Sequence, residues 1–188
     1  MRKPQDITVD RALLLLLLHL TDSHSMVSDV KVQQLVFLSE LQMLSKGLRG
    51  FHFEFMRFAY GAFSKELDND LLALRRKERL ENCRLTEQAT DVITIIEQNV
   101  EDEGEEANVQ IMDILRSVIE TYAPQDLGEI TSSVENVEIS PAGKPEEKIA
   151  IRDVSFHSIL LVPSRIEVSG EFTLPPLTVS SLNTALGY

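Results

Sequence analysis

With 188 residues, the chain is long enough to bury one good core, or one domain with a small appendage. Hydrophobic residues make up 43% and charged residues 26% of the sequence, and these values exclude wholesale disorder. The formal net charge of -12 argues against nucleic-acid binding, yet residues 1–80 hold 12 Lys or Arg against 10 Asp or Glu, so the acidity belongs to residues 81–188.

The single cysteine, Cys83, has no partner for an intramolecular disulfide, which favours a reducing cytosol. Basic residues precede the run Leu13–Leu18 in the outline of a signal peptide, but Asp6 and Asp10 interrupt the approach and no clear cleavage site follows. No segment reaches the roughly 20 apolar residues that a membrane span requires. The sequence therefore predicts a cytoplasmic protein without membrane contact.

The first two segments predict helices. Six consecutive leucines make a helix over about residues 8–20 apolar nearly all round, which is typical of a core element. A second helix is expected over residues 30–46, with a broad apolar face opposite a polar one. Ser28 or Asp29 would cap its start, and Gly47 would end it in a left-handed conformation.

The chain is organised around residues 51–86, where the apolar period changes. Three phenylalanines at every second position predict a strand over residues 51–58. A turn over residues 60–63 precedes a helix over residues 64–76 and a small two-stranded ribbon over residues 80–85. This order of strand, turn, helix and ribbon suggests a winged helix, in which a β-ribbon lies beside the last helix of a helix-turn-helix.

Helical patterns continue after the ribbon. Apolar residues at helical spacing predict helices over residues 86–99 and 108–122, and a shorter one over residues 126–134. Between the first two lies the run 101–106, five acids around one glycine, which is typical of a solvated linker or a helix start.

The C-terminal part is more mixed, and the predicted fold class is mainly α. Residues 135–148 hold two prolines and one glycine, which favours a linker or a mobile loop. Three patterned segments follow: a strand or helix at 156–162, a strand at 166–174 and a short helix at 178–186. We therefore expect residues 1–135 to form a helical domain with a winged-helix-like element, and residues 136–188 to form a C-terminal extension.

Two motifs in the expected helical domain are shared with a known family. The segment KVQQLVF at residues 31–37 resembles the pattern K-x-Q-K-L-x-Y/F, and YGAFSKEL at residues 60–67 resembles Y-G-P-x-S-x-x-L. The later Leu85-Thr86 pair resembles an L-T step of the same family. In this order, over about residues 8–135, the chain resembles the Panacea domain of SocA-like antitoxins.

This resemblance implies a helical domain with a winged-helix-like element and a protein partner. Members of the family are regulators and antitoxins encoded beside toxins, and one of their modes of action is to deliver a toxin to a protease. The chain departs from the pattern at Ala62, where the family usually has proline, and at Gln34, where it has a second lysine. No glycine follows Thr86, where many members have one.

Five residues are candidates for contact with a partner: Lys31, Gln33, Tyr60, Gly61 and Ser64. The glycine permits positive φ and a close backbone approach, and the tyrosine can bury its ring while its hydroxyl serves a partner. The alternative for the pair Tyr60-Gly61 is a purely structural turn. For Lys31 and Gln33, the alternative is the solvated polar edge of an amphipathic helix.

Four cations form the candidate nucleic-acid-binding cluster: Arg75, Arg76, Lys77 and Arg79. They lie where the predicted helix ends and the ribbon starts, a position from which side chains can contact the phosphates of a duplex. The alternative is a solvated cluster at a helix C-terminus, where cations are favourable. Acidic residues on the same helix support this alternative.

Catalytic and metal-binding patterns are missing from the sequence. The four histidines do not have the spacing of a metal site, and neither C-x-x-C nor H-E-x-x-H occurs. The sequence also contains no nucleophile elbow, P-loop or dinucleotide-binding glycine pattern. Cys83 has no histidine nearby and is expected to be a small buried residue. We expect no enzyme, no cofactor and no metal, with a small hydrolase-like enzyme as the third hypothesis.

The leading hypothesis is a non-enzymatic protein-interaction module that binds and neutralises or delivers a protein partner, such as a toxin encoded nearby. We expect a more basic partner on the acidic helical surface of residues 87–135, because opposite charge accelerates and orients an encounter. A homo-oligomer is compatible with this hypothesis. The alternative is a winged-helix DNA-binding transcriptional regulator that uses the third helix and the basic ribbon.

Overall fold

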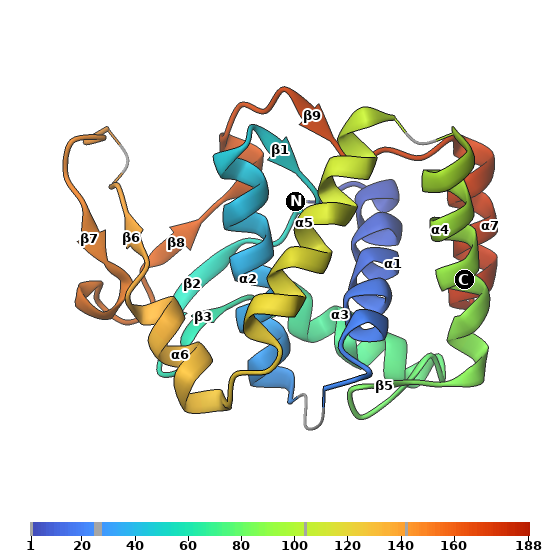
Figure 1. The fold of residues 1–188 in the computed structure, drawn as a ribbon, viewed down its shortest axis with the longest axis horizontal. Coiled ribbons are helices and arrows are strands. Elements are labelled where there is room, and N and C mark those ends of the chain that lie inside the picture. Colours follow the sequence, from blue (N-terminus) through green and yellow to red (C-terminus); the bar gives the residue numbers. More distant parts are fainter. Residues whose placement is uncertain (1, 25–27, 104, 142) are drawn as a thin grey trace.

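The fold is mainly helical with small sheets, as expected. It is known from a computed structural model that describes residues 2–24, 28–103, 105–141 and 143–188 (Figure 1). The helices are α1 (Pro4–Leu20), α2 (Asp29–Ser45), α3 (Lys65–Arg76), α4 (Thr90–Glu103), α5 (Glu106–Tyr122), α6 (Leu127–Glu135) and α7 (Pro176–Leu186). None of the described helices combines the length and the apolar character that a membrane crossing needs.

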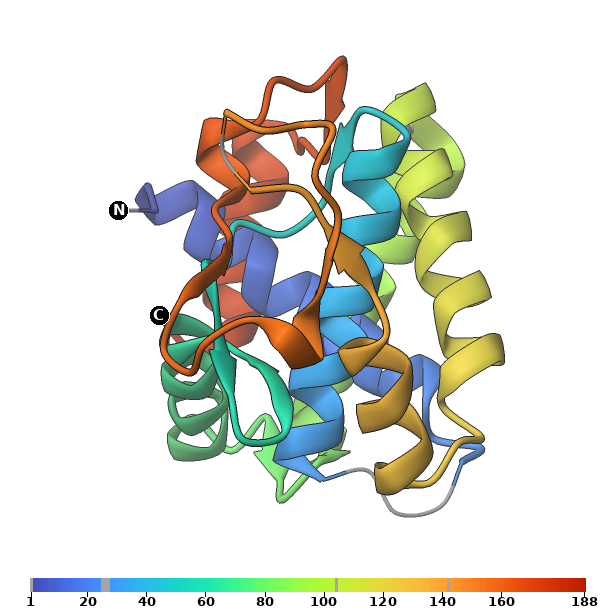
Figure 2. The ribbon, with the colours of Figure 1, turned by 90° about the vertical axis from the view of Figure 1, so that its left-hand side faces the viewer.

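The strands are short and form separate small sheets. Their bounds are β1 (Leu48–Arg49), β2 (Phe55–Phe58), β3 (Gly61–Phe63), β4 (Leu80–Glu81), β5 (Arg84–Leu85), β6 (Glu138–Ile139), β7 (Ile149–Ala150), β8 (Ile159–Leu161) and β9 (Gly170–Glu171). An antiparallel sheet has the order β3-β2-β8, β1 pairs with β9 in parallel, and β4-β5 and β6-β7 are hairpins. Figure 2 shows the three-stranded sheet on one side of the molecule.

Helix α1 is the centre of the core. It packs between α2 and α5 on one side and α4 and α7 on the other (Figure 1). Each side chain of the run Leu13–Leu18 is at most 1% exposed, so the expectation of a helix buried all round is confirmed. The helix starts earlier than expected, at Pro4, because proline suits the first helical position and the Asp6 carboxylate accepts a hydrogen bond from the Lys3 amide (2.8 Å).

The order predicted for residues 51–86 is present. The paired strand begins only at Phe55, but the side chains of Phe51, Phe53 and Phe55 are all buried, as alternation requires. The turn expected over residues 60–63 lies instead at Ala59 and Tyr60, and Gly61–Phe63 is strand β3, because the chain pairs back on β2 directly after Tyr60. Gly61 begins this strand with φ of +100°, and Ser64 caps α3 through the Leu67 amide (3.3 Å). The ribbon β4-β5 follows α3, with two residues in each strand.

Residues 136–188 share the core of the preceding domain. Strand β8 extends the β2-β3 hairpin, β9 pairs with β1, and α7 packs on α1 and α4. Phe172 and Leu182 are buried in the same core as the leucines of α1. Residues 135–148, expected to be a linker, include β6 and lead into the β6-β7 hairpin. Of the strand expected at 166–174, only Gly170–Glu171 pairs.

Candidate functional site

Two glutamines of the family-like motif bind the edge of the three-stranded sheet. The Gln33 amide donates to the Ser64 carbonyl (3.0 Å) and accepts from the Ser64 N–H (2.8 Å). Gln34 makes the same two-way contact with Ala62, at 3.1 and 3.2 Å. Both glutamines are at most 3% exposed. The two amides therefore occupy the outer backbone edge of β3 and of the residue that follows it, and they fix the hairpin on α2.

Lys31 and Ser64 also serve contacts inside the chain. The Lys31 ammonium donates to the carbonyl of Ala123 (2.6 Å) and is 4% exposed, and Ser64 is completely buried at the start of α3. Lys31 and Gln33 are thus not the solvated edge of an amphipathic helix, because α2 is covered by β3 on one side and by the α5-α6 connection on another. Of the five candidates, Tyr60 alone is largely exposed, at 58%.

Gly61 has a structural reason to be glycine. Its φ of +100° disfavours any residue with a side chain, and a Cβ there would lie 2.6 Å from the Gln34 Oε1 atom. The close approach of the hairpin to α2 therefore requires glycine at this position. The same turn carries Tyr60 outward, next to the buried Gln34 that holds the hairpin.

An apolar groove of about 260 Å³ lies between the β2-β3 hairpin and the starts of α2 and α3. We call it the hairpin groove; its lining includes Val30, Phe58, Tyr60, Ala62, Phe63 and Asp68. The Phe58 and Phe63 rings lie 5.2 Å apart, and Phe58 remains 41% exposed. In Figure 2, the hairpin lies between α3 and α2. The outer face of an antiparallel sheet is normally polar, so a partly exposed aromatic pair on this face is characteristic of an interaction site.

The basic cluster is divided between internal contacts and solvent. Arg75 binds the Asp29 carboxylate and the carbonyl of Asn82 (2.9 Å), so it ties α3 to α2 and to the ribbon. Arg79 donates to the carbonyl of Ala185 (2.6 Å) and ties the ribbon to α7.

The other two cations of the cluster are exposed. Arg76 and Lys77 face solvent, and the Lys77 ammonium lies 4.7 Å from the Tyr188 ring centre. Because Arg75 and Arg79 are engaged in contacts within the protein, the four cations do not form one continuous patch that could face phosphates.

Cys83 is half-buried beside the ion pair of Arg75 and Asp29. Its thiol donates to the Asp29 carboxylate (3.2 Å). Burial, followed by the hydrogen bond and the negative charge of Asp29, raises the pKa of Cys83 to about 12. A thiol with this pKa is protonated at neutral pH and is a poor nucleophile. The sequence predicted a small buried residue, whereas the structure has Cys83 only half-buried.

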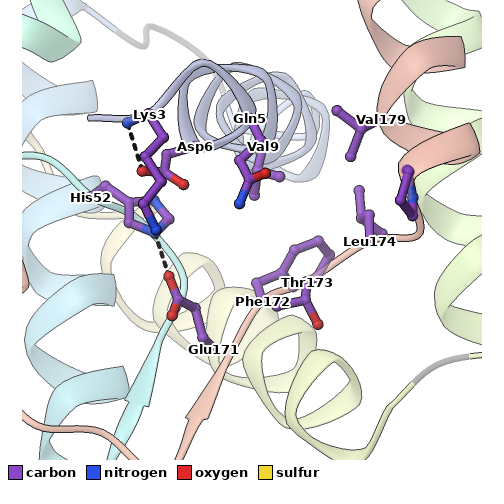
Figure 3. Close-up of a pocket in the computed structure, with 11 residues that line it drawn as sticks. Lys3, Gln5, Asp6, Val9, His52, Glu171, Phe172, Thr173, Leu174 and Val179 are labelled. Atoms are coloured by element: carbon purple, nitrogen blue, oxygen red, sulfur yellow. Dashed lines mark hydrogen bonds and ion pairs between the residues drawn. The ribbon is translucent and has the colours of Figure 1, made fainter.

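A second concave region lies at His52 and has a different character (Figure 3). The His52 ring joins Asp10 of α1 through Nδ1 (2.9 Å) and Glu171 of β9 through Nε2 (2.7 Å). Asp10 is completely buried and also binds Arg2 (2.8 Å). Burial opposes a charge on the ring, but the two carboxylates outweigh it and raise the pKa of His52 to about 9.

The pocket in front of His52 holds about 340 Å³ and has two unlike walls. Lys3, Asp6, His52 and Glu171 form its polar wall, and Val9, Leu174 and Val179 are among its apolar residues (Figure 3). At neutral pH both ring nitrogens of His52 donate to carboxylates, so the ring has no free lone pair to act as a general base. Sequence reasoning missed this region, because Asp10 and Glu171 are distant from His52 along the chain.

A further buried acid lies behind His52. Glu40 on α2 is completely buried, and its carboxylate accepts from the Phe51 amide (2.8 Å). Burial, which outweighs this hydrogen bond, raises the pKa of Glu40 to about 8. Its second oxygen makes no hydrogen bond with the described residues. Glu40 is therefore held mostly in its neutral form at neutral pH.

The described residues contain no group of three or more His, Cys, Asp or Glu side chains arranged to hold a metal ion. None of the protein-family models, curated proteins or solved structures compared with the chain matches it. The resemblance to the Panacea domain therefore depends on the motifs at residues 31–37, 60–67 and 85–86.

Proposed function

We propose that this protein is a non-enzymatic interaction module of the SocA-like antitoxin or regulator type, which binds a protein partner through the hairpin groove. The observation that carries the proposal is the exposure of Phe58 and Tyr60 on a hairpin that is fixed from behind. Aromatic side chains at the rim of a desolvated groove are typical anchors of protein interfaces. The partner would be neutralised or delivered by this contact, as the family resemblance implies.

The rigidity of the hairpin supports this proposal. Two hydrogen bonds with Gln34 hold the backbone of β3 at Ala62, and two with Gln33 hold Ser64 directly after the strand. Gly61 leaves no space between the hairpin and α2. A binding surface that is already ordered loses little conformational freedom when the partner binds. The groove volume of about 260 Å³ is also below the roughly 300–1,000 Å³ of typical small-molecule sites, and suits a protein side chain better.

The surroundings of the titratable groups support the absence of catalysis. His52 is engaged at both nitrogens, and the Cys83 thiol is protonated and bound to Asp29. A nucleophile or a general base needs a free lone pair within reach of a substrate. Neither group offers one at neutral pH.

We also infer that α3 and the β4-β5 ribbon form the winged-helix-like element. The ribbon follows α3 directly, and Arg75 and Arg79 hold the two against α2 and α7. Since these two cations are engaged, the alternative function of DNA binding would depend on Arg76 and Lys77. Binding to duplex DNA with a steep decrease as salt rises, flattened in Arg76→Ala/Lys77→Ala, would favour that alternative.

The proposed function is tested by co-expression with the product of the adjacent gene. The wild-type chain should co-purify with it and, if that product is toxic, should restore growth. Phe58→Ser/Tyr60→Ser should lose both effects, because the aromatic anchors of the groove are gone. The matched control is Leu177→Ser, which changes an 83% exposed residue on α7. Retention of the partner by the double variant would contradict the proposal.

A further inference from the structure

We propose that the partner segment in the hairpin groove is basic as well as apolar, and that its lysine or arginine pairs with Asp68 at the rim of the groove. This inference rests on the proposed function and specifies the chemistry of the partner.

The donors in the groove wall are committed to the chain itself. Both Gln33 and Gln34 line the groove, but their amide nitrogens donate to the carbonyls of Ser64 and Ala62. Their oxygens accept the N–H groups of the same residues. A partner therefore meets mainly apolar surface inside the groove. Hydrogen bonds and ion pairs with the partner must come from residues at the rim of the groove.

Two carboxylates lie at this rim, and they differ in their surroundings. Both oxygens of Asp29 bind the Arg75 guanidinium, and one of them also accepts from Cys83. Asp68, in the first turn of α3, makes neither an ion pair nor a side-chain hydrogen bond with the described residues. Lys65, which is close to Asp68 along the chain, does not line the groove and forms no ion pair with Asp68. Asp68 is thus an acceptor without a donor beside an apolar cavity.

A cation next to an apolar side chain fits this arrangement best. The apolar side chain would fill the groove between Val30, Phe58 and Phe63, while the cation meets Asp68 at its edge. The charge of the whole chain acts in the same direction, since its formal net charge is -12. A basic segment would be attracted before contact, and a second copy of this acidic chain would be repelled.

The inference is tested by selecting short random peptides on the immobilised full-length protein. Selection on the wild type should enrich peptides with a large apolar residue beside Lys or Arg. Selection on Phe58→Ser/Tyr60→Ser should not enrich these peptides. Asp68→Lys should lose the same peptides or select acidic ones instead. Asp113→Lys, the same charge change at an exposed position on α5, should select as wild type does. Thermal unfolding of each variant establishes that it is folded.

One selected peptide is then titrated against each variant. Asp68→Lys should weaken its binding on the order of fivefold, and the difference should shrink as salt rises, because an exposed ion pair is worth little and is screened.

The outcomes separate the two proposals. Peptides that require Phe58 and Tyr60 but show no basic preference, or are unaffected by Asp68→Lys, would overturn this inference and leave the proposed function intact. A selection without any peptide that requires those aromatic residues would overturn both. A concentration-dependent dimer of the wild type that Phe58→Ser/Tyr60→Ser dissociates would also overturn the inference, because a second copy would then occupy the groove.

Discussion

The stability of this protein should decrease as the pH rises from about 6.5 to about 9, and His52 is the main reason. The two carboxylates that bind the ring raise its pKa from 6.5 in the unfolded chain to about 9 in the fold. The stabilisation that comes from this raised pKa is complete at pH values below the pKa of the unfolded chain. It is lost as the pH rises through the pKa of the folded chain. At about 1.4 kcal/mol per pKa unit, the free energy of unfolding should decrease by about 3 kcal/mol.

Glu40 changes stability in the same direction over a lower range of pH. Its pKa rises from 4.5 in the unfolded chain to about 8 in the fold, so folding takes up a proton between these values. The contribution of Glu40 to stability is therefore complete below about pH 4.5 and decreases as the pH rises toward about 8. Since His52 and Glu40 interact, their two effects are measured together in the wild type.

The assay is denaturant unfolding, followed by circular dichroism, across this range of pH for wild type and His52→Gln. The variant should be less stable near pH 6.5, and the gap should narrow toward pH 9, where the wild-type ring also loses its charge. His19→Gln, at an exposed position near the end of α1, is the control and should follow the wild type. Parallel curves for wild type and His52→Gln would refute the assignment of the slope to the ion pairs of His52.

Two further predictions concern the hairpin. Gly61→Ala should destabilise the fold by roughly 2–4 kcal/mol in thermal unfolding, because positive φ is strained with a side chain and the new Cβ displaces Gln34. Gly143→Ala is the control, because Gly143 also has a positive φ of +78° but a Cβ there would meet none of the described residues. An equal decrease in stability in this control would show that the contact with Gln34 does not cause the destabilisation in Gly61→Ala. Gln33→Leu should cost about 1–3 kcal/mol, since it leaves the buried N–H of Ser64 unpaired while the Ser64 carbonyl keeps the N–H of Asp68. The exposed Gln98→Leu should be nearly neutral.

The local signals in the sequence predicted much of the fold. Ser28 and Ser64 cap α2 and α3, and Gly47 and Gly187 end helices with positive φ. The change of apolar period at Gly61 also marks the hairpin between the extended segment and α3. These features depend on residues that are neighbours along the chain, so a sequence contains them directly.

The candidate sites were harder to predict because they depend on distant contacts. The ring of His52 binds Glu171, 119 residues away, and no spacing rule connects such a pair. The polar edge of α2 gave a misleading signal, since Lys31 and Gln33 are surface-type residues that find buried partners in Ala123 and Ser64. Periodicity indicates which face is apolar, but it does not show whether another element covers the polar face.

The side-chain amides of Gln33 and Gln34 have a consequence for the solubility of the protein. A sheet edge with open N–H and C=O groups invites pairing with strands of other chains, which leads to aggregation. At β3, two glutamines fill the positions that such a strand would take at Ala62 and Ser64. The hairpin can therefore present aromatic side chains to a partner while its own backbone edge is closed to unrelated strands.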